Sequence, residues 1–301
     1  MRKIRNYDVS GLFSFFTPNV GFSWIMTGIC LVLQLGVGVL FALPFMMGYF
    51  GADLLQLVTY TLTFALLLLP CASFSRFNAM RMQEGIALSS GKHLRAAGGF
   101  LPLALLVIVG TFGTVLALDP INTAVAKLPL PGSELMEQFM KMILDGNPWI
   151  WLINLVILAP LFEETFCRGI LLRGMLKTVK PHWAIILSAL MFAFIHGNLV
   201  QGINAFFLGC IIGYAYYKTG NIWLAMLMHA TNNLMSFLLL YTPLSQYDSL
   251  LDVMPVWGYV LLVLGGIALT AGFVWLLRRI PLQGDYGNLD RVRFEDLVPQ
   301  R

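Results

Sequence analysis

Long apolar segments follow one another along almost the whole sequence. Eight of them are recognisable, at residues 22–43, 54–74, 100–118, 149–172, 183–199, 203–217, 222–242 and 256–277. A helix needs about 20 apolar residues to cross the hydrocarbon core of a bilayer, and only the segment 203–217 falls clearly short. Just 11% of the 301 residues are charged, against about 25% in soluble domains. The sequence therefore excludes a soluble or disordered chain, and it predicts an all-α, polytopic integral membrane bundle of about eight transmembrane helices.

The positive charges predict how this bundle lies in the membrane. Lys and Arg gather in every second connection, and three of the other connections (44–53, 200–202 and 243–255) contain none. Loop 119–148 contains Lys127 and Lys141, but it has more acidic than basic residues. Because basic loops stay on the cytoplasmic side, we expect both termini in the cytoplasm and a location in the cell (inner) membrane.

The chain has one domain by this interpretation. We expect a cytoplasmic segment at 1–21, a transmembrane domain at 22–277 and a cytoplasmic tail at 278–301. Residues 133–145 form a separate amphipathic pattern, with apolar residues at helical spacing on one face. This segment is either a helix in the outer membrane interface or a packed loop helix. The four cysteines lie in apolar segments without a CxxC pair, so they predict neither a disulfide framework nor a zinc knuckle.

Ionisable residues inside membrane spans are costly and mark functional sites. The fourth span contains adjacent Glu163 and Glu164, followed by Arg168. Glu164 and Arg168 have the i,i+4 spacing of a helical ion pair. Glu163 points about 100° away on the helix and needs a partner from elsewhere. Pro160 is expected to loosen the preceding turn and to leave room for water near Glu163.

Two further spans add polar groups of the same kind. His196 ends the fifth span, and His229 and Asn233 share one face of the seventh. A carboxylate, two imidazoles and an amide on three spans are what a buried hydrolytic site needs. Helical rise places His196 about 20 Å from the inner surface, farther than His229 at roughly 11 Å. His196 therefore meets the other two only if the fifth span tilts or starts below the surface.

These residues resemble the motifs of a known family. Glu163-Glu164-Thr-Phe-Cys-Arg168 is similar to the EExxxR motif of the CAAX protease and bacteriocin-processing intramembrane endopeptidases. Phe192-Ala-Phe-Ile-His196 resembles the FxxxH motif of that family, and His229-Ala-Thr-Asn-Asn233 its HxxxN motif. The three motifs occur in the family's order, and the similarity covers residues 149–240.

The resemblance implies an eight-helix bundle with a water-filled cavity open to the cytoplasmic side. It implies that Glu163 and His196 activate water, that His229 and Asn233 stabilise the oxyanion, and that Glu164 and Arg168 support the site. The family is commonly classed as metallopeptidase, so Glu163, His196 and His229 are candidate zinc ligands. The chain lacks a compact ligand motif such as HExxH, and a metal-free glutamate mechanism stays open.

The leading hypothesis is therefore an intramembrane endopeptidase that cuts a membrane-anchored or hydrophobic polypeptide, prenylated CAAX-type chains among them. The expected partners are this substrate and the bilayer, without nucleic acid, and the oligomeric state is open. One alternative is a non-enzymatic scaffold or bacteriocin-immunity protein that uses the same polar cluster structurally. A proton-coupled transporter ranks last, because the sequence shows no matched halves.

Overall fold

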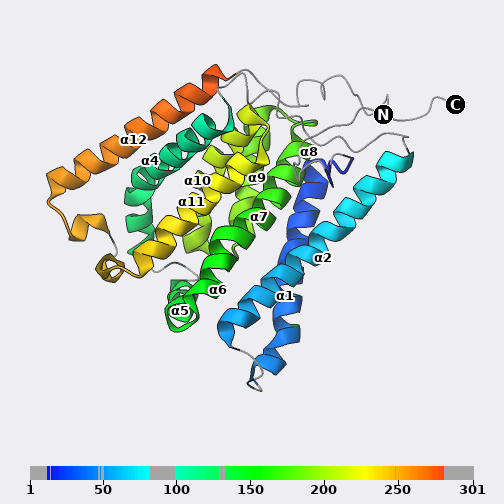
Figure 1. The fold of residues 1–301 in the computed structure, drawn as a ribbon, viewed down its shortest axis with the longest axis horizontal. Helices are drawn as coiled ribbons and strands as arrows, with labels where there is room; N and C mark the ends of the chain where they lie inside the picture. The colour runs from blue at the N-terminus through cyan, green and yellow to red at the C-terminus, as the bar shows by residue number, and fades with distance from the viewer. Residues whose placement is uncertain are drawn as a thin grey trace.

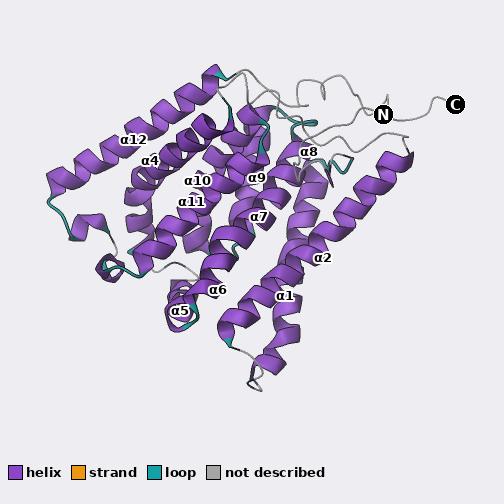
Figure 2. Ribbon diagram, viewed as in Figure 1, coloured by secondary structure: helices purple, strands orange, loops and turns teal. Residues whose placement is uncertain are grey.

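A computed structural model describes residues 12–13, 15–46, 48, 51–81, 99–128, 130, 133–247 and 249–280. These residues are helical with short connections, and no strand occurs among them (Figure 2). The expected all-α fold is confirmed. Of the predicted segments 1–21 and 278–301, the structure describes residues 12–13, 15–21 and 278–280, and their cytoplasmic location stays a prediction.

Seven helices in the described part are long and apolar enough to cross a bilayer. Six are simple α-helices: α1 (Val20–Met46), α2 (Ala52–Arg81), α4 (Phe100–Ala126), α10 (Leu199–Thr219), α11 (Ile222–Leu240) and α12 (Val256–Arg279). The seventh runs from Pro148 to Met175 and is built from five consecutive pieces. These are α6 (Pro148–Leu152), η2 (Ile153–Leu158), α7 (Ala159–Glu164), η3 (Thr165–Leu172) and α8 (Arg173–Met175).

The fifth and sixth predicted spans have different lengths from those expected. The helix α9 (Pro181–Phe194) has only 14 residues, whereas α10 has 21. The chain leaves α9 through Gly197, which has a positive φ of 69°, a conformation that glycine adopts without steric cost. Asn198 then caps α10 by accepting a hydrogen bond from the Gln201 amide at 2.8 Å. The prediction of a full span at 183–199 and a short one at 203–217 was therefore wrong, because the turn between them comes earlier.

The fourth span is confirmed, and it departs from regular α-geometry on both sides of Glu163. Two π-helical segments, η2 and η3, flank α7. The η2 segment ends directly before Ala159 and Pro160, where the missing proline N–H breaks the α-helical hydrogen-bond pattern. The expected loosening of the turn before Pro160 is confirmed. Such π-turns frequently occur at functional sites.

The bundle has two distinguishable ends (Figure 1). At one end α8 ends, and the last turns of α10 and α12 meet where Lys218 Nζ donates to the Arg278 carbonyl at 3.4 Å. The C-terminal part of α2 lies at this end too, since Ser75 Oγ accepts from the Phe15 amide just before α1 at 3.1 Å. At the other end lie the short helix α5 (Ser133–Asp145) and the start of α6 (Figure 1). The amphipathic segment 133–145 is thus a helix, with the expected bounds.

Candidate active site

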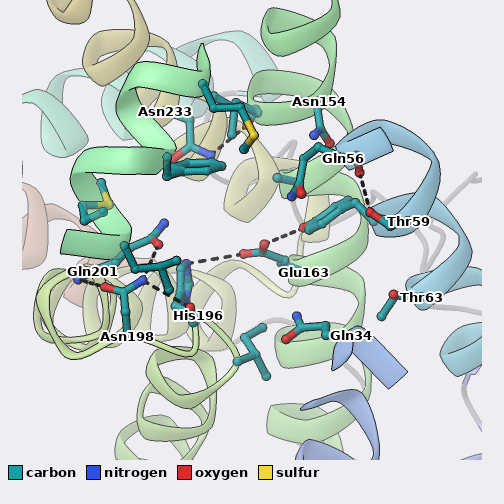
Figure 3. A pocket seen from close by; sticks show the side chains of 18 of the residues that line it. Gln34, Gln56, Thr59, Thr63, Asn154, Glu163, His196, Asn198, Gln201 and Asn233 are labelled. Carbon is teal, nitrogen blue, oxygen red and sulfur yellow. Dashed lines mark hydrogen bonds and ion pairs between the residues drawn. The ribbon is translucent and has the colours of Figure 1, made fainter. Parts of the chain in front are cut away.

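The structure brings the three sequence motifs together around Glu163. Glu163 Oε2 lies 4.0 Å from Nε2 of His196 and 3.9 Å from Nε2 of His229. Glu163 comes from α7, His196 from the turn after α9, and His229 from α11. His196 and His229 thus both reach Glu163, although helical rise had placed them at different distances from the inner surface. In Figure 3, Glu163 points toward His196.

Tyr60 of α2 is the partner that Glu163 needed. Its hydroxyl donates to Glu163 Oε1 at 2.5 Å, a short hydrogen bond of the charge-assisted kind. The ring of Tyr60 packs against Phe64 and Phe162, with centroids 5.0 and 6.3 Å away. Tyr60 therefore fixes one carboxylate oxygen and leaves Oε2, which has no hydrogen-bond partner in the described structure, to the two imidazoles.

Hydrogen bonds at Nδ1 determine what the two imidazoles offer at Nε2. His196 Nδ1 lies 2.7 Å from the carbonyl oxygen of Phe192. A carbonyl only accepts, so we assign the proton to Nδ1 of His196. His229 Nδ1 lies 2.9 Å from Glu164 Oε1, and the same assignment holds because this carboxylate also binds an arginine. Each Nε2 is then a lone pair in the neutral ring and a donor in the imidazolium.

Glu164 and Arg168 form the ion pair that their spacing predicted. Arg168 Nη1 donates to Glu164 Oε1 at 3.1 Å, and both side chains are fully buried. Arg168 Nη2 also donates to the Gly209 carbonyl at 2.8 Å. A Cβ at Gly209 would lie 3.2 Å from that nitrogen, so glycine allows α10 this close approach. The pair thus connects the fourth span, α10 and His229.

Phe192, the first residue of the FxxxH motif, packs between the charged groups. The Arg168 guanidinium lies 4.6 Å over its ring centroid. The rings of His196 and His229 meet it edge-on, at centroid distances of 4.9 and 5.4 Å. Phe192 therefore holds both imidazole rings in place by aromatic packing. It was not among the predicted site residues.

Asn233 reaches the fourth span at its π-turn. Its Nδ2 donates to the Leu155 carbonyl at 2.8 Å. In the register of η2, where the Ala159 amide binds the Asn154 carbonyl, the next donor to Leu155 would be residue 160, which is a proline. Asn233 satisfies the carbonyl that Pro160 leaves free. One N–H of the Asn233 amide is used in this way, and its predicted role at an oxyanion stays a prediction.

A cavity of about 540 Å³ leads to this cluster. Glu163, His196, His229 and Asn233 line it together with residues of α1, α2 and α5. The α2 wall consists of Gln56, Thr59, Tyr60 and Thr63, of which Gln56, Thr59 and Thr63 are labelled in Figure 3. Their i, i+3, i+4, i+7 spacing is one helix face. This polar stripe in the second apolar segment is the signal that could have revealed the α2 contribution, including Tyr60.

The position of the cavity conflicts with one pair of expectations. Its α5 lining residues belong to the end of the bundle opposite to α8, whereas the basic residues at the ends of α2, α10 and α12 lie at the α8 end (Figure 1). Cytoplasmic termini and a cytoplasmic cavity opening cannot both hold in this arrangement. The positive-inside orientation and the orientation implied by the resemblance are therefore incompatible.

The donor types at Glu163, His196 and His229 are those of zinc sites. In the part of the chain that the structure describes, however, no group of three His, Cys, Asp or Glu side chains has a spacing that could hold a metal ion. The three residues as arranged do not fit a bound metal, and the zinc site stays a prediction.

Comparison with known proteins supports the resemblance. Residues 145–235 match the model of the family described as type II CAAX prenyl endopeptidase Rce1-like. No curated protein and no solved structure matched the chain. The matched segment contains all three motifs and runs from the end of α5 into α11. The predicted family is thus confirmed for this segment, and the match supports an intramembrane protease of the CAAX type in general.

Proposed function

We propose that this integral membrane protein is an intramembrane endopeptidase that hydrolyses a peptide bond in a membrane-anchored or apolar polypeptide. The observation that carries the proposal is the arrangement at Glu163. Its free oxygen Oε2 lies within 4.0 Å of two imidazole nitrogens at the inner end of a cavity. The family match over residues 145–235 supports proteolysis as the reaction class.

Glu163 is the proposed general base. Since Tyr60 occupies Oε1, a water molecule in the cavity is activated at Oε2. The carboxylate takes one proton from this water while its oxygen attacks the carbonyl carbon of the scissile bond. His196 lies close enough to orient the same water. Its Nδ1 is occupied by the Phe192 carbonyl, so Nε2 is the ring nitrogen that faces Glu163. Once a proton has moved onto Glu163, it is delivered to the leaving amine as the C–N bond breaks.

His229 and Asn233 are proposed to stabilise the oxyanion of the tetrahedral intermediate. Glu164 holds Nδ1 of His229, so an imidazolium would present its Nε2–H to the cavity. Asn233 keeps one amide N–H after bonding to Leu155. Glu164 and Arg168 are buried and act as positioning residues through His229. None of these steps requires a metal ion, and the arrangement of the residues gives no reason to involve one in any step.

The test is cleavage of membrane-anchored peptides by the purified protein in lipid, with a prenylated CAAX-type peptide in the panel. Glu163→Gln keeps the shape of the side chain and removes the base, so we expect a rate loss of about 100-fold or more. His196→Ala is expected to lose a similar factor. His182→Ala is the matched control, because His182 is exposed at the start of α9 and should retain full activity.

Two outcomes would redirect the proposal. Equal cleavage by the wild-type protein and both site variants would contradict the assignment of the site. Inhibition by a chelator that added zinc reverses would establish a metal route through rearranged ligands. Thermal unfolding of each variant, measured in the same lipid, separates a lost base from a lost fold.

A further inference from the structure

The two ends of the bundle differ sharply in positive charge. In the described part of the chain, the end formed by α8 and the last turns of α2, α10 and α12 contains Arg76, Arg81, Arg173, Lys177, Lys180, Lys218, Arg278 and Arg279. The α5 end contains Lys127 and Lys141. Positively charged residues near the ends of membrane spans favour the cytoplasmic side. This asymmetry predicts that the α8 end is cytoplasmic and that the α5 end faces the outside.

The cavity is open at the α5 end. Leu135 and Gln138 of α5 line it and are exposed on the surface, Leu135 by 58%. Asn198, in the turn between α9 and α10, also lines it and is half-buried. Thr63 and Glu163, at its inner end, are buried. The exposed lining residues thus form a mouth beside α5.

Toward the α8 end, the cavity is closed by packed side chains. Every residue from Glu163 to Met175 is buried. Phe166, Ile170 and Met175 belong to one continuous hydrophobic core, which also includes Ile212 and Tyr216 of α10. This layer separates the active-site residues from the basic end. Water and peptide therefore reach Glu163 from the α5 end.

We infer that the cavity opens to the extracytoplasmic side, and that the substrate presents its cleavage segment there. The inference rests on the proposed function only where it calls the bound polypeptide a substrate. The side on which the cavity opens follows from charge and packing alone. It resolves the conflict between the two orientations in favour of cytoplasmic termini. It also sets the substrate class apart from chains that offer their cleavage site at the cytoplasmic surface.

The lining of the cavity indicates the chemistry of that segment. Six uncharged amide side chains line it outside the catalytic cluster: Gln34, Gln56, Gln138, Asn154, Asn198 and Gln201. Amides both donate and accept, as a peptide backbone does. No Lys or Arg occurs among the described lining residues, so the cavity offers no cation to hold a free terminal carboxylate. We therefore expect an internal, uncharged peptide segment whose apolar side chains pack on Leu135 and Phe139 of α5.

Cysteine labelling in intact cells tests the side of the mouth without requiring activity. The variants are Gln138→Cys at the mouth, Gln56→Cys inside the cavity and Lys180→Cys at the basic end. A small membrane-impermeant thiol reagent is applied to intact cells and to inverted membrane vesicles. The unsubstituted chain gives the background, because Cys30, Cys71 and Cys167 are buried and Cys210 is half-buried.

We expect Gln138→Cys and Gln56→Cys to react at least tenfold faster in intact cells than in inverted vesicles, and Lys180→Cys to show the reverse preference. Reaction of either cavity cysteine from the cytoplasmic side would overturn the inference. Labelling of the Gln138→Cys variant but not of the Gln56→Cys variant would overturn the conclusion that the cavity is open beside α5.

A pair of reporters produced in the same cells then tests the substrate. Both have one membrane anchor and the same uncharged segment, placed just outside the bilayer in one and just inside it in the other. The inference predicts cleavage of the outer reporter alone, and its loss in Glu163→Gln. Cleavage of the inner reporter would overturn the inference. Cleavage of neither, with the expected labelling, would contradict the proposed protease activity and leave the side of the mouth supported.

Discussion

The span formed by α6 to α8 and the pair formed by α1 and α2 differ in how much of each helix is enclosed by the rest of the protein. In the most apolar 18-residue segment of the α6 to α8 span, half of the residues are buried inside the protein, against 22% in α1 and in α2. The first contains Glu163, Glu164 and Arg168 together with two π-turns, whereas α1 and α2 are each one continuous α-helix. Charged groups need protein partners that lipid cannot supply, so the chemistry is placed on the enclosed span.

The two regions are nevertheless connected through α2. The outlying α2 contributes a polar stripe to the cavity and, through Tyr60, a hydrogen bond to the proposed base. The family match begins at residue 145 and leaves α2 out. The enclosed span therefore supplies the reacting groups, and the outlying pair supplies one wall and the orientation of Glu163.

The largest effect is expected at the centre of the enclosed span. Arg168→Met keeps most of the side-chain volume but removes the arginine charge and leaves the buried Glu164 with His229 as its partner. Breaking a buried ion pair in this way costs about 3–5 kcal/mol. We expect a marked fall of the thermal unfolding midpoint in detergent, together with loss of cleavage, since Glu164 also holds His229.

Two variants make this prediction specific. Arg279→Met is the matched control, because Arg279 lies on the exposed end of α12 over Trp275, and its unfolding midpoint should stay near wild type. The double variant Glu164→Gln with Arg168→Met removes both charges and should recover part of the lost stability. An Arg168→Met protein as stable as Arg279→Met would show that the two spans do not differ as described.

An intermediate effect is expected at the π-turn. Asn233→Leu leaves the Leu155 carbonyl without its donor, and an unsatisfied buried polar group costs about 1–3 kcal/mol. Pro160→Ala in the same chain restores a backbone N–H that can reach this carbonyl. We expect the unfolding midpoint to fall in Asn233→Leu and to recover in part in the double variant. No recovery would contradict the account of the proline-induced gap.

The smallest effect is expected from α2. Tyr60→Phe removes only the hydroxyl that donates to Glu163. Because the ring and its packing remain, we expect stability to change little and the cleavage rate kcat to fall about tenfold, or about 1.4 kcal/mol. KM should stay unchanged, since the hydroxyl acts on the base and not on the substrate. Steady-state kinetics on a cleaved reporter measures both constants.

Tyr247→Phe is the matched control, because Tyr247 is exposed beyond α11 and should leave both constants unchanged. A rise of KM with unchanged kcat in Tyr60→Phe would make Tyr60 a substrate contact in the cavity wall. A loss of the folded protein would give it a purely structural role. Either result would break the division of labour between α2 and the enclosed span.

The sequence predicted the membrane spans and the polar cluster for clear physical reasons. Long apolar segments have one low-energy state in lipid, the membrane-spanning helix. Buried ionisable groups stand out against such a background, which is why Glu163, His196 and His229 were recognisable before their contacts were known. The Glu164–Arg168 pair could be predicted because i,i+4 geometry is local to one helix.

The misassigned fifth span shows the limit of this reasoning. Residues 183–199 are apolar enough for a full span, yet α9 ends at Phe194. The turn at Gly197 follows its end and the cap at Asn198 begins α10, and hydropathy does not detect a local stop inside an apolar segment. His196 lies in this turn, with its Nε2 4.0 Å from Glu163 Oε2.

Taken alone, the sequence determined that this chain forms a helical membrane bundle, which ends of its spans are basic, and which residues are suited to hydrolysis. Only the tertiary structure decided that Tyr60 of α2 holds Glu163, that Asn233 satisfies the carbonyl freed by Pro160, and that the cavity opens beside α5. The physical reason is range. Span formation and ion pairing within a helix depend on neighbours in sequence. Which helix faces which depends on packing between segments far apart in the chain, such as Tyr60 and Glu163, which are 103 residues apart.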